Sequence, residues 1–127
     1  MYEIIDVLGK IDNFEWFGRS PSSDAKGTDL NYPPTVVWRY KKRNTLLISR
    51  IKKTIESFKG KVEWQFYEYG RNMVLIPKRL NEITEDRKLL GNKEAARLLM
   101  EEDPEFGQLA NNDLKELAKF IYNEIVV

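Results

Sequence analysis

The feature that most constrains the fold is a strand–helix–strand pattern between residues 35 and 67. Residues 35–42 (TVVWRYKK) are rich in β-branched and aromatic side chains, which favours a strand. Asn44 can cap a following helix, and Gly60 can end it. The apolar residues of this helix recur at helical spacing: Leu47, Ile51, Ile55 and Phe58. In residues 62–67 apolar and polar side chains alternate, as in a strand with one buried face.

A crossover of this length joins parallel strands, so residues 35–67 are predicted to form a βαβ unit. Residues 69–72 (YGRN) are typical of a hairpin turn, after which residues 73–76 should pair antiparallel with residues 62–67. The two kinds of pairing together predict a mixed sheet.

Shorter elements precede this unit. Helical spacing of apolar side chains predicts an amphipathic helix at residues 2–10. Residues 14–18 (FEWFG) and 29–32 are predicted to be short strands, separated by a loop rich in Gly, Pro, Ser and Asp at residues 18–28. The sheet should therefore contain four to five strands.

Beyond Pro77 the pattern changes to helices, predicted at residues 80–90 and 92–100. Asp113 and Glu116 form a D-x-x-E capping box, which predicts that a final helix begins at Asp113. The sequence thus predicts the α/β (α+β) class, with C-terminal helices following the sheet.

Length and charge describe how these elements are organised. A chain of 127 residues fits one domain. Residues 1–79 contain 15 basic and 9 acidic residues, whereas residues 80–127 contain 6 and 11. We therefore expect a single domain, 1–127, with a basic α/β core and an acidic helical extension.

Missing residue types limit the chemistry. The chain has no cysteine and no histidine, which excludes disulfides, thiolate or imidazole metal ligands, thiol nucleophiles and serine–histidine triads. Any metal would be a hard cation bound through oxygen. No apolar run approaches the ~20 residues of a membrane span, and the first residues lack a signal-peptide pattern. A cytoplasmic protein without a membrane partner is expected.

Three residues suggest a metal-dependent site. Glu3 lies in the first predicted helix, Asp29 precedes a short strand, and Lys41 follows Arg39 by two positions. Over residues 3–77 this arrangement resembles the PD-(D/E)XK nucleases, in particular the archaeal Holliday-junction resolvases. The resemblance implies Glu3, Asp29 and Lys41 as catalytic residues, with Glu3 and Asp29 binding Mg²⁺ or Mn²⁺. Arg39 departs from the family pattern, which has an acid at that position.

This departure matters because phosphodiester hydrolysis needs two or three carboxylates around the metal. Arg39 presents a cation instead, so a nuclease-like core that binds without cleaving is expected, unless Glu56 or Glu63 replaces the missing acid. Each candidate also has an ordinary structural interpretation. Glu3 suits the dipole of a helix start, Asp29 suits a turn, and Lys41 suits a solvated strand end.

Basic residues interleaved with aromatics are the second functional signal, since phosphates attract cations and bases stack on rings. The segment 39–61 carries nine basic residues and one acid, Glu56. Tyr40, Tyr67 and Tyr69 are predicted to be exposed. Trp38, Trp64 and Phe66 are predicted to be core. The expected nucleic-acid-binding residues are Arg39, Tyr40, Lys41, Lys42, Arg43, Arg50, Lys53 and Arg71.

The alternative is a non-catalytic interaction or assembly protein, such as a viral or accessory factor. A protein partner would then bind the acidic C-terminal helices. The apolar residues expected to form that surface are Leu98, Leu99, Met100, Phe106 and Leu109.

Overall fold

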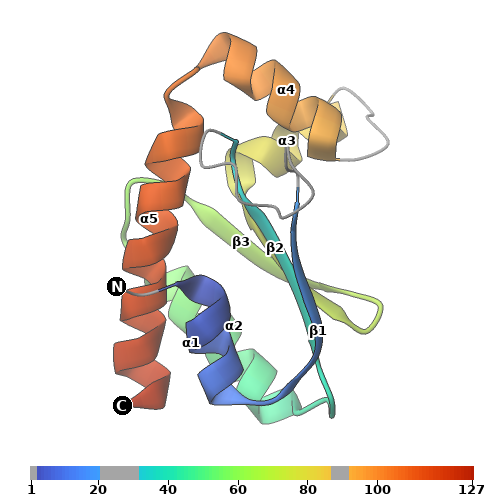
Figure 1. The fold of residues 1–127 in the computed structure, drawn as a ribbon, viewed down its shortest axis with the longest axis vertical. Helices are drawn as coiled ribbons and strands as arrows, with labels where there is room; N and C mark the ends of the chain where they lie inside the picture. The colour runs from blue at the N-terminus through green and yellow to red at the C-terminus, as the bar shows by residue number, and fades with distance from the viewer. Residues whose placement is uncertain (1–2, 21–31, 87–91) are drawn as a thin grey trace.

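A four-stranded sheet with helices packed on it forms the fold (Figure 1). The computed structural model describes residues 3–20, 32–86 and 92–127. The strands are β1 (Phe14–Ser20), β2 (Thr35–Tyr40), β3 (Trp64–Tyr69) and β4 (Asn72–Pro77). The helices are α1 (Ile4–Ile11), α2 (Thr45–Ser57), α3 (Lys78–Asp86), α4 (Asn92–Glu102) and α5 (Phe106–Ile121), which continues into the π-helical turn η1 (Tyr122–Val126). The α+β class with C-terminal helices is confirmed.

The strand order is β1-β2-β4-β3, and every neighbouring pair is antiparallel. The expectation of a mixed sheet was therefore wrong. β2 and β3 do run parallel to each other, as predicted for residues 35–67, but β4 lies between them and pairs with both. The βαβ unit is split, and its two strands share no hydrogen bonds.

The position of β4 follows from its turn and its composition. Tyr69 pairs with Asn72 across a two-residue turn in which Gly70 has φ of 60°, so the predicted hairpin is confirmed. From Met73 to Pro77 every residue of β4 is buried. A strand that is apolar on both faces suits the centre of a sheet, and an apolar run of this kind marks such a strand in a sequence.

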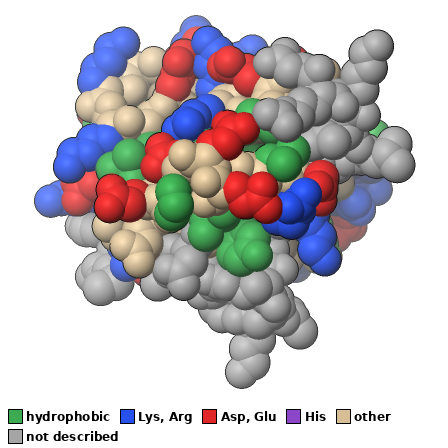
Figure 2. Space-filling view, turned by 90° about the horizontal axis from the view of Figure 1, so that it is seen from above, with side chains coloured by type: hydrophobic (Ala, Val, Ile, Leu, Met, Phe, Trp, Pro, Cys, Tyr) green, Lys and Arg blue, Asp and Glu red, His purple; other side chains and the backbone are tan. Residues whose placement is uncertain are grey.

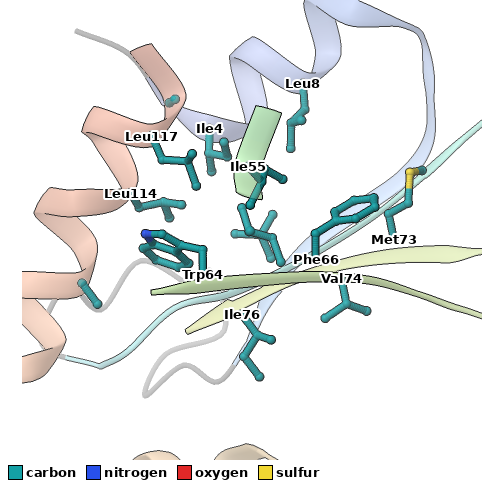
Figure 3. Packing of buried hydrophobic residues seen from close by; sticks show 14 of the residues in the cluster. Ile4, Leu8, Ile55, Trp64, Phe66, Met73, Val74, Ile76, Leu114 and Leu117 are labelled. Carbon is teal, nitrogen blue, oxygen red and sulfur yellow. The ribbon is translucent and has the colours of Figure 1, made fainter. Parts of the chain in front are cut away.

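Helix α2 begins where the sequence predicts. The side chain of Asn44 accepts a hydrogen bond from the backbone N–H of Leu47 at 3.1 Å. The helix buries Ile48, Ile51 and Ile55. With α1 and α5 it covers the sheet face that carries Trp64 and Phe66, whereas Val74 and Ile76 point to the opposite face (Figure 3).

Helix α5 belongs to the core of the domain. Its residues Leu114, Leu117 and Ile121 are buried in the same cluster as Ile4 and Leu8 of α1. The helix begins at Phe106, so the expectation that Asp113 caps it was wrong. Asp113 lies in the middle of the helix and is buried.

The opposite face of the sheet carries α3, which follows β4 without a break. The side-chain amide of Asn81 donates a hydrogen bond to the Gln65 side chain at 3.0 Å, and Leu80 is fully buried. The strand predicted at residues 29–32 and most of the loop predicted at residues 18–28 lie outside the described residues. Within the described helices, none is long and apolar enough to cross a membrane.

Candidate nucleic-acid interface

The connection between β2 and α2 lies at one end of the sheet, beside the start of β1. The backbone N–H of Lys41 donates to the carbonyl oxygen of Asn13 at 3.0 Å, which fixes this connection to the α1–β1 junction. Figure 1 shows the start of β1, the end of β2 and the start of α2 together at the bottom of the view. Lys41, Lys42 and Arg43 are all exposed here.

Two hollows flank Lys42 and Arg43, and both residues line each of them. The narrow hollow has a volume of about 100 Å³ and extends to the β3–β4 turn. The wide hollow has a volume of about 570 Å³ and extends along the first turn of α2 to Asn13. The end of the sheet is thus concave and lined by several basic side chains together with Asp12 and Glu68.

Several of the predicted basic residues are held by acids. Arg43 forms a bidentate ion pair with Glu68, with donor–acceptor distances of 2.9 and 3.2 Å, and also donates to the hydroxyl of Thr45 at 2.6 Å. Arg71 lies 3.7 Å from Glu15. These arginines are ordered by their partners and only partly available to a ligand.

Arg39 is held most firmly. Its guanidinium forms an ion pair with Glu15 at 3.1 Å, and its Nε donates to the Asn72 side chain at 2.9 Å. It therefore bridges the β1 bulge next to Glu15 and the start of β4. This gives Arg39 a structural role within the sheet.

The lysines differ from the arginines. Lys41, Lys42, Lys52 and Lys53 are exposed, and none of the four forms an ion pair with another residue of the described chain. The guanidinium of Arg50 on the same helix donates to the carbonyl oxygen of Glu124 at 2.9 Å. We call Lys41, Lys42, Arg43, Lys52 and Lys53 the basic surface.

Tyr40 does not belong to this surface, so the expectation of an exposed ring was wrong. The residue is only 4% exposed, its ring stacks on Phe14 at a centroid distance of 5.5 Å, and its hydroxyl donates to the carbonyl oxygen of Leu8 at 2.8 Å. Burial raises the pKa of Tyr40 well above its ordinary value. Val36, Trp38 and Tyr40 alternate along the strand, so the three side chains share one face, and this face is buried.

The other predicted rings divide between surface and core. Tyr69 is 74% exposed, as predicted, while Tyr67 is half-buried, and burial raises its pKa. Trp38, Trp64 and Phe66 are buried, as predicted. Across the described chain the rings thus offer a base less area than the sequence suggested.

Two exposed rings of the edge strand β1, Trp16 and Phe17, were missed by the sequence interpretation. Trp16 on the edge strand β1 is 48% exposed, and its indole lies across Gly18, where an added Cβ would come within 3.2 Å of the ring. The glycine two positions along the same strand is the signal for this arrangement, because residues i and i+2 share one face of a strand. The missing side chain leaves room for the flat ring.

Of the three residues implied by the nuclease resemblance, the structure describes Glu3 and Lys41. Glu3 precedes the first turn of α1, whereas the backbone of Lys41 is bonded to Asn13 beyond its last turn. Eight helical residues separate the two ends of α1 by about 12 Å. Asp29 lies outside the described residues. In the part that the structure describes, no group of three acidic side chains could hold a metal ion.

The two acids proposed as substitutes lie elsewhere. Glu63 precedes β3 at the sheet end opposite Lys41 and forms an ion pair with Lys78 at 3.3 Å. Glu56 is exposed near the C-terminal end of α2. Neither carboxylate is positioned to complete a site around Lys41.

The surface expected to bind a protein partner is only partly accessible. Leu99 is fully buried, Phe106 is nearly so, Leu98 and Met100 are half-buried, and Leu109 is exposed. Acidic and basic side chains are interspersed on the face seen from above in Figure 1, where α4 lies (Figure 2). On α4, Arg97 forms ion pairs with both Glu94 and Glu101. The acidic excess is thus partly neutralised where the helices are exposed.

No protein-family model, curated protein or solved structure matches the chain.

Proposed function

We propose that this protein binds nucleic acid through the basic surface, without cleaving it. The observation that carries the proposal is that four exposed lysines, Lys41, Lys42, Lys52 and Lys53, lie along α2 and its N-terminal connection with no ion pair to another described residue. An ammonium group without an acidic partner can contact a phosphate without giving up an existing interaction. Its gain in affinity comes from release of the counterions condensed on the polyanion.

The surroundings of these lysines add to the same field. The N-terminus of α2 faces the wide hollow, and its helix dipole is positive at that end. Glu56 is the single acid within α2. A surface with one dominant sign of charge raises the local concentration of a polyanion and speeds its association.

The proposal includes a nuclease-like core whose described residues form no group of three acids for a metal ion. Arg39 occupies the position at which the PD-(D/E)XK pattern requires an acid, and its ion pair with Glu15 keeps a cation there. Glu3 lies at the N-terminal end of α1, whereas Lys41 is bonded to Asn13 beyond its C-terminal end. We therefore assign Lys41 to phosphate contact and derive no metal-dependent step.

A salt titration tests the function directly. Fluorescence anisotropy would be measured with labelled duplex DNA, single-stranded DNA and single-stranded RNA, from about 25 to 300 mM salt. We expect log K to fall linearly with log salt, with a slope of about −3 to −5 if four or five phosphates are contacted. The absence of binding to all three ligands at the lowest salt would overturn the proposal and favour the protein-interaction alternative.

A further inference from the structure

We infer that the narrow hollow beside Arg43 accepts one unpaired base of a bound strand, so that the protein prefers single-stranded or unpaired nucleic acid to duplex. The inference rests on the proposed function and adds the class of ligand. It starts from a contrast between the residues that line the two hollows. The narrow one includes the buried side chains of Tyr40, Ile48 and Met73, whereas the residues that line the wide one are polar or charged apart from Leu46.

The floor of the narrow hollow comes from three elements. Tyr40 of β2, Ile48 of α2 and Met73 of β4 line it, and all three side chains are buried to more than nine-tenths. Their exposed atoms at the bottom of the hollow offer a phosphate no hydrogen-bond donor, because the Tyr40 hydroxyl is already bonded to Leu8. A flat apolar ring suits this floor better than a charged group does.

The wall and the mouth are suited to the rest of a nucleotide. The bidentate Arg43–Glu68 pair forms one wall and is fixed further by the bond from Arg43 to Thr45, so this wall exists before a ligand arrives. Lys42 and Arg71 line the same hollow. Gly70 also lines the hollow, and no atom lies within 4 Å of the position of an added Cβ there.

The volume limits what can enter. A cavity of about 150 Å³ accommodates benzene, so a hollow of about 100 Å³ that opens to solvent takes a single six-membered ring partly inserted. A pyrimidine should therefore bind better than a fused purine. A base within a duplex is not available without extrusion, which costs a few kcal/mol. The adjoining wide hollow, with Lys41 at its edge, gives the neighbouring phosphates a continuous path.

Methyl NMR on the unmodified protein gives a direct test. The chain has three methionines, of which Met73 lines the hollow and Met100 lies on α4, so Met100 serves as an internal control. A base ring above the floor should shift the Met73 methyl resonance through its ring current. We expect a ten-residue oligo(dT) to shift Met73 but not Met100, and a duplex of equal length to bind without shifting Met73.

The possible results separate the two proposals. If oligo(dT) saturates the anisotropy signal while Met73 does not move, the base site is wrong and the binding function stands. If no nucleic acid binds, the proposed function itself is wrong. If thymidine monophosphate shifts Met73 with an affinity equal to that of oligo(dT), the hollow is a free-nucleotide site, and the assignment to a strand is overturned.

A filling substitution gives an independent readout. Ile48→Phe should place a ring in the hollow and reduce the preference for oligo(dT) over duplex by about tenfold, the effect of losing one stacked base. Leu109→Phe adds a ring at an exposed position of α5 outside the hollow and is the control that should keep the preference. Circular dichroism would show that both variants are folded. An unchanged preference in a folded Ile48→Phe variant would contradict the inference.

Discussion

The buried carboxylate of Asp113 accepts a hydrogen bond from the indole Nε1 of Trp64 at 2.9 Å, joining α5 to the first residue of β3. The same carboxylate accepts from the backbone N–H groups of Lys61 and Val62 at 3.0 and 3.1 Å. One side chain thus orders the whole connection between α2 and β3. The residue that the sequence suggested as a helix cap holds a distant loop instead.

Replacement of this carboxylate should be costly. In Asp113→Ala three donors lose their acceptor, two of them buried, and we expect a loss of about 3 kcal/mol in the free energy of unfolding, measured by urea denaturation. Glu116→Ala is the control, because a capping box would need Glu116. We expect that exposed substitution to change stability by less than about 0.5 kcal/mol. An equal loss in both variants would restore the capping interpretation.

Gly60 should be intolerant of a side chain for the same reason. An added Cβ would lie 2.6 Å from both carboxylate oxygens of Asp113 and would also clash with the ring of Phe58. Gly60→Ala must therefore displace the loop or the helix, and a destabilisation of about 1–3 kcal/mol is expected from thermal or urea unfolding. Gly70→Ala would separate steric from conformational effects, because that site is open but has a positive φ. A Gly60→Ala variant as stable as the wild type would show that the contact is not rigid.

The basic surface should contribute strongly to nucleic-acid affinity and little to the free energy of unfolding. Replacing Lys41, Lys42 and Arg43 together with Ala should weaken nucleic-acid binding by about 1–3 kcal/mol at low salt and flatten the salt slope. The matched control removes three cations from the C-terminal helices: Lys93, Lys115 and Lys119. The control should retain both affinity and slope. Equal losses in the two triple variants would mean that only net charge matters.

Metal-dependent cleavage should be absent. We expect neither the wild type nor Arg39→Glu to cleave DNA or RNA with Mg²⁺ or Mn²⁺, because the new carboxylate would face Glu15 rather than a set of converging ligands. Calorimetry should show no divalent binding to either protein. Gain of cleavage in Arg39→Glu, abolished by adding Asp29→Ala, would instead establish a disabled nuclease site.

Tyr40 should make the fold sensitive to alkaline pH. Its pKa is raised in the folded state, mainly by burial, from an ordinary value of 10.0 that applies when the chain is unfolded. Stability is then constant below about pH 10 and falls above it, by up to ~1.4 kcal/mol per pH unit for this group. Tyr40→Phe should lose about 1 kcal/mol at neutral pH, from the missing bond to Leu8, but show a flatter decline above pH 10.

Urea unfolding at pH 8 to 11 would test this expectation. Tyr67 contributes in the same direction, because burial also raises its pKa, so the decline should become shallower in Tyr40→Phe without disappearing. Tyr69→Phe is the exposed control and should follow the wild type. Parallel curves of stability against pH for Tyr40→Phe and the wild type would show that the Tyr40 hydroxyl ionises as readily in the folded chain as in the unfolded chain.

Local signals in the sequence were sufficient where structure is local. The Asn44 cap and the turn at Gly70 depend on residues a few positions apart, and both were predicted correctly. The insertion of β4 between β2 and β3 depends on pairings between distant segments, which periodicity does not encode. The capping prediction for Asp113 was wrong because D-x-x-E spacing also occurs inside helices. Here the Asp113 carboxylate accepts hydrogen bonds from Trp64 and the loop before it.

In the candidate site too, local features could be predicted from the sequence and contacts between distant segments could not. Clustering of Lys41 and Lys42 in the sequence was enough to place them on one exposed surface. The restraint of Arg39 by Glu15 and Asn72 was not predictable, because those partners come from other strands. Tyr40 was mistaken for a surface ring because its basic neighbours outweighed the strand alternation that places it beside Trp38.

The central place of β4 has a consequence for how the chain folds. The β3–β4 hairpin closes over two residues and should form within microseconds, whereas β2 must return from far along the sequence to pair Val36 with Leu75. Until β2 docks, the apolar β4 presents an unpaired edge, which is the kind of strand that templates aggregation. Lys78 and Arg79 follow this strand directly, and their charges oppose association of such intermediates during that interval.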